Sequence, residues 1–216
     1  MILIITKENI LFNDYLELKN INKIKCPGEL KISKGISKIM KNEVIIYKSI
    51  DSIVQCRVGI KWIMENFTEI ETIMFIGFVE PTNSLLLKNH FLIPTKIINI
   101  TDPQLEWSRE NLVAKSIMTD SNQQKVIRNA IYSSNLDYIY GNIASIFFSN
   151  YSKDAVLDIS LLEICYGINN LCFSVNELAK EYNVNIFNIL IGAPEKYYSS
   201  KKIKYKKFFS NLNIGQ

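Results

Sequence analysis

Histidine and glycine are scarce in this chain. Its 216 residues include a single histidine, His90, and eight glycines. A Ser-His-Asp or Cys-His catalytic arrangement would therefore have to use His90, which lies at the start of a strand pattern, where a structural or surface role is the better interpretation. The sequence contains neither a P-loop nor a Gly-x-Gly-x-x-Gly segment, so it lacks the usual glycine-rich phosphate cradles.

Cysteine pairs, metal-ligand spacings and long apolar runs are also missing. The four cysteines are scattered and form no Cys-x-x-Cys pair, which favours free thiols in a reducing cytoplasm over a disulfide framework or a zinc site. No apolar run is long enough to span a bilayer. The apolar start, Met1 to Thr6, is short and is typical of a first strand rather than a signal peptide. We therefore expect a cytoplasmic protein without a metal, a cofactor or a membrane partner.

The charge balance is only mildly basic. The formal net charge of +4 does not by itself demand a nucleic-acid partner. Much of the excess lies in residues 196–216, where basic and aromatic residues alternate. One interpretation is a tail that touches RNA or a membrane, and a steep salt dependence of RNA binding would support it. The other, which we favour, is an amphipathic helix with Tyr205, Phe208, Phe209 and Leu212 on its buried side.

Short apolar strands alternate with helical patterns along the chain. Strands are predicted at 1–6, 43–47, 72–76, 90–100, 138–148 and 171–175, with Gly77 and later Pro81 closing the third and a possible bend at Gly141 in the fifth. Helices are predicted at 12–19, from Ser52 to Phe67, and at 121–133 with Ser121 or Asp120 as its cap. Residues 155–166 are predicted to form a helix or a strand that leads into one. The pattern predicts an α/β fold: one three-layer domain over residues 1–216, with a mixed central sheet flanked by helices.

Four carboxylates lie near predicted strand ends, where ligands bind in α/β sheets. They are Glu80, Asp158, Glu177 and Glu181. Each one, taken alone, is more often a solvated or capping group than a catalytic one.

Taken in order, the segments resemble the nucleoside phosphorylase superfamily and, within it, the 5′-methylthioadenosine/S-adenosylhomocysteine nucleosidases. The similar segments are "MILIIT", "VGIKWIMENFTEIETIMFIGFVEP", "NHFLIPTKIIN", "YGNIAS", "AVLDISLLEI" and "LCFSVNE". The first is similar to the family's opening strand, and the fourth to its Gly-x-Ile-x-Ser pattern. The fifth occupies the place of an acidic motif that opens a helix, and the sixth that of the last strand.

This resemblance implies a substrate and roles for particular residues. Phe147 or Phe148 would stack on a purine base, although filling the core is an equally good interpretation. Asp158 would hold the ribose hydroxyls, and Glu181 or Glu177 would protonate the leaving base. Gly77 and Ser145 belong to the matching segments and would lie in the substrate site. Since no basic residue aligns with the family's phosphate-binding positions, hydrolysis is expected rather than phosphorolysis.

The segment "GFVEP" departs from the family's glycine-rich turn, because bulky residues follow Gly77. Two hypotheses therefore stay open. The first is a divergent purine nucleosidase that acts on methylthioadenosine-type or S-adenosylhomocysteine-type nucleosides. The second is a degenerate homologue that binds a nucleoside or a partner protein without turnover. Under either hypothesis the resemblance implies a homodimer, and nucleic acid is not the expected partner.

Overall fold

The computed structural model describes most of the chain. The described residues are 1–7, 13–49, 52–82, 84–87, 89–100, 115–146, 165–192, 202–212 and 214. The strands are β1 (Ile2–Lys7), β2 (Leu18–Lys23), β3 (Lys31–Ser37), β4 (Asn42–Ser49), β5 (Thr72–Pro81), β6 (Phe91–Ile100), β7 (Lys115–Met118), β8 (Tyr138–Ile146), β9 (Cys165–Ile168) and β10 (Asn185–Gly192). The helices are α1 (Asn13–Leu16), α2 (Ile53–Asn66), α3 (Ser121–Ser133), α5 (Cys172–Glu181) and α6 (Lys202–Asn211).

These strands form one mixed sheet, as predicted. Its order is β10-β6-β8-β9-β5-β1-β4-β3-β2, and β7 pairs with β6. Strand β10 also pairs with β5, so that β10, β6, β8, β9 and β5 close into a ring while β1 to β4 extend from it as an open sheet. Strands β1, β4, β5 and β10 run in one direction, and their carboxyl ends therefore lie on the same side of the sheet.

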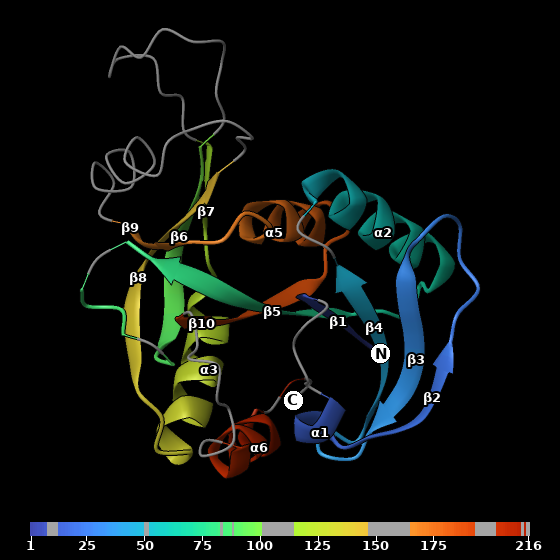
Figure 1. The fold of residues 1–216 in the computed structure, drawn as a ribbon, viewed down its shortest axis with the longest axis horizontal. Coiled ribbons are helices and arrows are strands. Elements are labelled where there is room, and N and C mark those ends of the chain that lie inside the picture. The colour runs from blue at the N-terminus through green and yellow to red at the C-terminus, as the bar shows by residue number, and fades with distance from the viewer. Residues whose placement is uncertain are drawn as a thin grey trace, which may run out of the picture.

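Helices cover both faces of the sheet, which gives the three layers expected (Figure 1). Residues alternate along β1: Ile2 and Ile4 pack in the core with α1, α3 and α6, whereas Leu3 and Ile5 pack in the core with α2 and α5. A central strand buried on both faces explains why its sequence is continuously apolar. No helix among the described residues is long and apolar enough to cross a membrane.

Most element types were predicted from local signals. Helix α2 begins where the sequence indicates, with the Ser52 hydroxyl accepting a hydrogen bond from Gln55 N at 3.3 Å. Helix α3 is capped by Asp120, the second of the two candidates, whose carboxylate accepts hydrogen bonds from Asn122 N and Gln123 N at 2.9 and 3.0 Å. An oxygen-bearing side chain at the N-cap satisfies amide groups that have no partner in the first turn.

Three local predictions were wrong. The segment 171–175 is not a strand but the start of α5: Leu171, Val175 and Leu178 recur at helical spacing and are all buried. Of the two residues expected to close β5, Gly77 does not end the strand, which continues to Pro81 because its last residues pair with β9. The helix predicted at 12–19 is described only over Asn13–Leu16, and β2 begins at Leu18.

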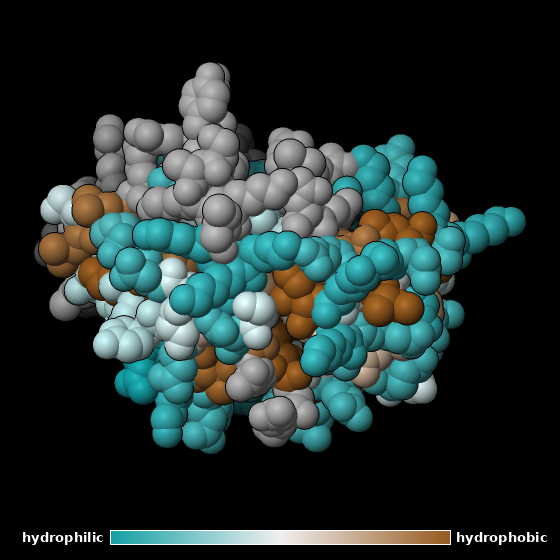
Figure 2. Space-filling view, turned by 90° about the horizontal axis from the view of Figure 1, so that it is seen from below, coloured by the Kyte–Doolittle hydropathy of each residue, from teal (hydrophilic) through white to brown (hydrophobic). Residues whose placement is uncertain are grey.

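Helix α6 lies over the sheet with its aromatic side inward. Tyr205, Phe208 and Phe209 are buried, whereas Lys204, Lys206 and Lys207 are exposed. Lys206 pairs with Glu17 across to the end of α1. The face that carries α1 and α6 is mostly polar, and apolar atoms reach its surface in several separate places (Figure 2). The described lysines of α6 thus lie on its solvent-exposed side, opposite the apolar side that packs on the core.

Gly141, in the first half of β8, allows a neighbouring aromatic ring to pack closely on the strand. A Cβ atom at this position would lie 2.3 Å from Cδ2 of the Tyr166 ring, so only glycine allows the ring to pack on the β8 backbone. The pairing of β6 with β8 also shifts register between Pro94 and Ile97, opposite Gly141 and Ile143. Gly141 is therefore required by packing within the ring of strands.

Candidate active site

A pocket of about 470 Å³ opens at the carboxyl ends of β1 and β5. Its wall consists of Lys7 from β1, residues 75–80 of β5, and residues 168–171 between β9 and α5. Its volume is in the range of small-molecule sites. The position follows the general rule that ligands bind at the carboxyl ends of parallel strands.

Asn169 joins the elements of this wall. Its side-chain amide donates a hydrogen bond to Phe78 O at 2.7 Å, and its side-chain oxygen accepts from Leu171 N and Cys172 N at 3.1 and 3.0 Å. Its backbone N–H donates to Ala144 O at 2.9 Å. Asn169 thus accepts hydrogen bonds from two amides at the start of α5 and ties that helix to β5 and β8.

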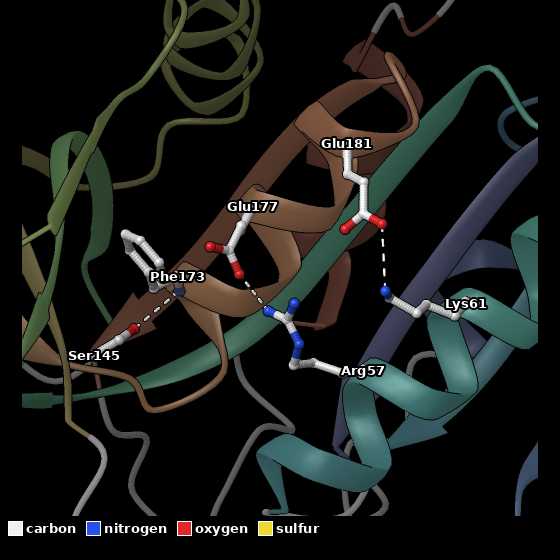
Figure 3. Close-up of polar contacts among 6 residues, drawn as sticks. All are labelled: Arg57, Lys61, Ser145, Phe173, Glu177 and Glu181. Carbon is white, nitrogen blue, oxygen red and sulfur yellow. Dashed lines mark hydrogen bonds and ion pairs between the residues drawn. The ribbon is translucent and has the colours of Figure 1, made fainter. Parts of the chain in front are cut away.

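Two of the expected site residues lie at this junction. Gly77 lines the pocket, and a Cβ atom there would lie 2.7 Å from the Asn169 side-chain nitrogen. Ser145 is fully buried; its hydroxyl donates to Asn169 O at 2.6 Å and accepts from Phe173 N at 2.9 Å (Figure 3). The described contacts of Ser145 therefore position α5, and Ser145 is not part of the pocket wall.

The two glutamates expected to act as the acid lie on α5 and face α2. Glu177 pairs with Arg57, and Glu181 Oε1 lies 3.3 Å from Lys61 Nζ (Figure 3). Both pairs are partly exposed, and neither glutamate lines the pocket. Arg57 and Lys61 are four residues apart on α2, and Glu177 and Glu181 are four apart on α5, so the two pairs lie one helical turn apart along the contact between these helices.

The resemblance placed the general acid after the last strand, and the structure changes which strand that is. The segment "LCFSVNE" is the first part of α5, and the last described strand is β10, which ends at Gly192. The segment after the last described strand therefore begins at residue 193 and does not include Glu177 or Glu181. Residues 193–200 lie outside the described residues.

The acidic helix-opening motif was expected in "AVLDISLLEI", residues 155–164, which lie outside the described residues. The helix that begins at the pocket is α5, and the residues directly before it are Asn169, Asn170 and Leu171, two amide side chains and an apolar one. Asp158, Phe147 and Phe148 lie outside the described residues. A helix-start signal was present in the sequence, since an Asn pair precedes a periodic apolar run.

A buried polar cluster behind the pocket was not anticipated. The side chains of Asn176 on α5 and Asn188 on β10 exchange two hydrogen bonds of 2.9 and 3.0 Å, and both residues are over nine-tenths buried. Cys172 lies beside them, and burial raises the pKa of its thiol. Such paired amides are satisfied only in one arrangement, so they fix α5 against β10.

The described residues contain no group of three or more metal-ligating side chains. His90 Nε2 lies 3.8 Å from an Asp137 carboxylate oxygen at the start of β6, outside the pocket wall. The four cysteines are free thiols. Among the described wall residues, the polar side chains are one carboxylate, two amides and one ammonium group.

Comparison with known proteins shows which proteins share this fold. No protein-family model and no curated protein sequence matches the chain. Among solved structures, a mutant futalosine hydrolase of Helicobacter pylori strain 26695 matches with a TM-score of 0.78 and 15% identity, over 98% of this chain and 97% of that one. The chain has the fold of the nucleosidases.

Two further structures share this nucleosidase fold. One is a mutant 5′-methylthioadenosine/S-adenosylhomocysteine nucleosidase of Helicobacter pylori, with a TM-score of 0.71, 16% identity and coverage of 98% and 94%. The other is the corresponding enzyme of Campylobacter jejuni, with a TM-score of 0.73, 16% identity and coverage of 97% and 94%. The likeness extends over nearly the whole chain, and the fold expected from the nucleoside phosphorylase resemblance is confirmed.

Proposed function

We propose that this protein is a nucleosidase that hydrolyses the N-glycosidic bond of purine nucleosides. The observation that supports this proposal most strongly is the pocket at the carboxyl ends of β1 and β5, in a chain whose fold matches nucleosidases over almost its whole length. One of those structures contains 5′-methylthioadenosine in its active site. Nucleosides of the methylthioadenosine or S-adenosylhomocysteine type are therefore the first substrates to test.

Hydrolysis of this bond requires an acid for the leaving base and a group that stabilises the positive charge on the sugar. Glu177 and Glu181 are poor candidates for the acid because both pair with cations of α2. The first carboxylate in the sequence after β10 is Glu195, within "APEKYYSS". We assign it the acid role, with Asp158 and one of Phe147 and Phe148 still assigned to ribose and base.

The second candidate function is nucleoside binding without turnover. The observation that favours it is the opening of α5, where Asn169 and Asn170 supply amides and Asn169 is committed to three side-chain hydrogen bonds. An amide can accept a hydrogen bond from a sugar hydroxyl but carries no charge to stabilise a cation.

The test is release of free base. Purified protein would be incubated with methylthioadenosine, S-adenosylhomocysteine, adenosine and inosine, with and without phosphate. We expect release without phosphate, loss of release in Glu195→Gln and Asp158→Ala, and retention in the matched control Glu177→Gln. Release that requires phosphate would contradict hydrolysis. No release, together with nucleoside binding by calorimetry, would establish the second candidate.

The proposal includes a homodimer in the cytoplasm. On α2, Val54 and Val58 lie one turn apart with exposed fractions of 69% and 55%, so this helix presents an apolar stripe that a second copy could cover. Light scattering during size-exclusion chromatography would measure the mass. A monomer at micromolar concentration would contradict this part of the proposal.

A further inference from the structure

We propose that the lysines where the β2–β3 hairpin meets α6 form a surface that binds a nucleic-acid duplex by its phosphate backbone, without reading its sequence. We name this surface the basic corner. Its lysines are all exposed: Lys19, Lys38, Lys41, Lys206 and Lys207. None of them lines the pocket, so the inference is independent of the proposed substrate.

The net charge of the chain, which alone does not indicate nucleic acid, is unevenly distributed. Residues 18–41 contain seven lysines and one acidic residue, Glu29. This segment therefore carries +6, whereas the whole chain carries +4, so the remaining residues together carry −2. Helix α6 contributes further lysines and no acidic residue. Clustering of lysines on one part of a chain is the electrostatic footprint expected of nucleic-acid binding.

Contacts at the end of α1 bring the hairpin and α6 together. The Lys38 N–H donates to Glu17 O at 3.4 Å, and the Lys206 ammonium pairs with the Glu17 carboxylate. Helices α1 and α6 lie side by side below the sheet (Figure 1). A hydrogen bond from Lys206 lowers the pKa of Glu17, and the charges of Lys38 and Lys19 act in the same direction. Lysines from β2, from the end of β3 and from α6 thus surround one carboxylate.

Two of these lysines also lie close to each other. Hydrogen bonding to the Lys38 side chain and repulsion by its charge lower the pKa of Lys19. Glu17 offsets this repulsion only in part, since it also pairs with Lys206. A phosphate group accepts hydrogen bonds from two ammonium groups at once, so a phosphate bound between Lys19 and Lys38 would remove the repulsion.

Protection of the sheet edge accounts for only some of these lysines. Strand β2 is the last strand on its side of the sheet, and lysines on such an edge discourage pairing with another chain. That explains Lys19. Lys38 and Lys41 lie instead in the turn between β3 and β4, and the remaining lysines of the basic corner lie on a helix.

The exposed apolar residues of the hairpin argue against a membrane or an apolar protein partner. Among the described residues of the hairpin they are Ile21 and Ile36. Ile21 lies over Gly35, since its Cγ1 would be 3.5 Å from a Cβ atom there. Neighbouring residues of a strand point to opposite faces, so Ile21 and Ile36 lie on opposite faces of the hairpin. The two side chains therefore cannot enter one bilayer or one partner pocket together.

The aromatic residues of α6 favour a duplex over a single strand. Tyr205, Phe208 and Phe209 are buried, and the exposed aromatic residues in the described part of the chain lie on α3 and β8. The basic corner therefore offers no ring on which an unpaired base could stack, as binding of single strands requires. A duplex needs no stacking and presents one phosphate charge about every 1.7 Å along its axis.

Fluorescence anisotropy with a short labelled RNA duplex tests the proposal, beside a DNA duplex and a single strand of the same sequence. We expect both duplexes to bind more tightly than the single strand. With five phosphates neutralised, log affinity should fall with log salt at a slope of about −4 to −5. The double variant Lys19→Gln/Lys38→Gln should make this slope shallower by about 2. The matched control Lys115→Gln/Lys180→Gln removes the same charge from exposed lysines of β7 and α5 and should leave the slope unchanged.

Several outcomes would overturn the proposal. One is no binding of either duplex at about 50 mM salt, and another is tighter binding of the single strand. An equal loss in both double variants would show that net charge, and not the basic corner, is responsible. Binding to vesicles of anionic lipid but not to a duplex would make the partner a membrane. Circular dichroism of both variants would show that the fold is retained.

Discussion

Replacing Gly77 by alanine should destabilise the protein, although the same change is usually favourable. Gly77 has an ordinary backbone conformation, since Gly28 is the one described glycine with a positive φ angle. In a strand, alanine in place of such a glycine typically adds about 0.4–1 kcal/mol of stability. Here the new methyl group would lie 2.7 Å from Asn169 Nδ2 and 3.1 Å from Cζ of the buried Phe75 ring.

The magnitude follows from what has to move. Asn169 cannot turn away without losing the hydrogen bonds to Phe78, Leu171 and Cys172 that hold the start of α5. Overpacking of this kind costs about 1–3 kcal/mol. Subtracting the usual gain for alanine leaves a net loss of roughly 0.5–2 kcal/mol in the free energy of unfolding.

Urea unfolding followed by circular dichroism would measure this loss, and a double-mutant cycle would locate it. In an Asn169→Ala background the obstructing amide is absent, so Gly77→Ala should be close to neutral. The coupling between the two sites should reach about 1 kcal/mol. A stabilising effect of Gly77→Ala in the otherwise unmodified protein, or the same cost in both backgrounds, would refute the reasoning.

Three further predictions follow from the ion pairs, the buried amides and a buried thiol. Glu177→Gln should lower the free energy of unfolding by at most about 1 kcal/mol, because its pair with Arg57 is partly exposed, and base release should be unchanged; loss of release at unchanged stability would return the acid role to Glu177. Asn176→Leu should cost about 1–3 kcal/mol in thermal unfolding, because it leaves the buried Asn188 amide unpaired, and adding Asn188→Leu should recover much of the loss; additive losses would argue against the pair. Burial raises the pKa of Cys56 from 9.0 to about 11. The folded state therefore holds this proton to higher pH than the unfolded state, and the resulting stability is complete below pH 9 and falls as the pH rises to about 11. Urea titrations across this range should show a shallower decline for Cys56→Ala, and an identical decline would contradict the assignment.

Local signals in the sequence were sufficient for many of the elements. The helix after Ser52 and the helix after Asp120 were predicted with their caps, because an N-cap acts over three residues. The strands at 1–6, 43–47 and 90–100 were predicted from their short apolar runs, which are typical of buried strands. The mixed sheet followed from their alternation with helices.

Interactions between segments that are distant in the chain could not be predicted from the sequence. Asn169 donates to Phe78 O from 91 residues away, and no local pattern indicates that bond. The continuation of β5 beyond Gly77 depends on pairing with β9, in which Pro81 lies opposite Gly167, 86 residues later in the chain. Strand ends that depend on so distant a partner carry no local signal. The arrangement of the pocket wall therefore required the structure.

The candidate acids show how one misplaced element alters a site. Five residues, 171–175, were interpreted as a strand because they are apolar, whereas the periodicity that marks a helix extends to Leu178 and Ala179. That error made α5 into the last strand and moved the expected acid onto Glu177 and Glu181. With β10 as the last described strand, the proposed acid is instead sought in the sequence after Gly192.

The ring of strands has a consequence for how the chain folds as it is synthesised. Strand β10 completes the ring by pairing with β5 on one side and β6 on the other. Its first residue, Asn185, pairs with Thr72, and Thr72 leaves the ribosome long before Asn185 does. Until β10 emerges, the edges of β5 and β6 that it will cover have no partner, and unpaired strand edges promote aggregation. Contacts this distant in sequence also slow folding. Nascent chains of this protein should therefore depend on chaperones until residue 192 has emerged.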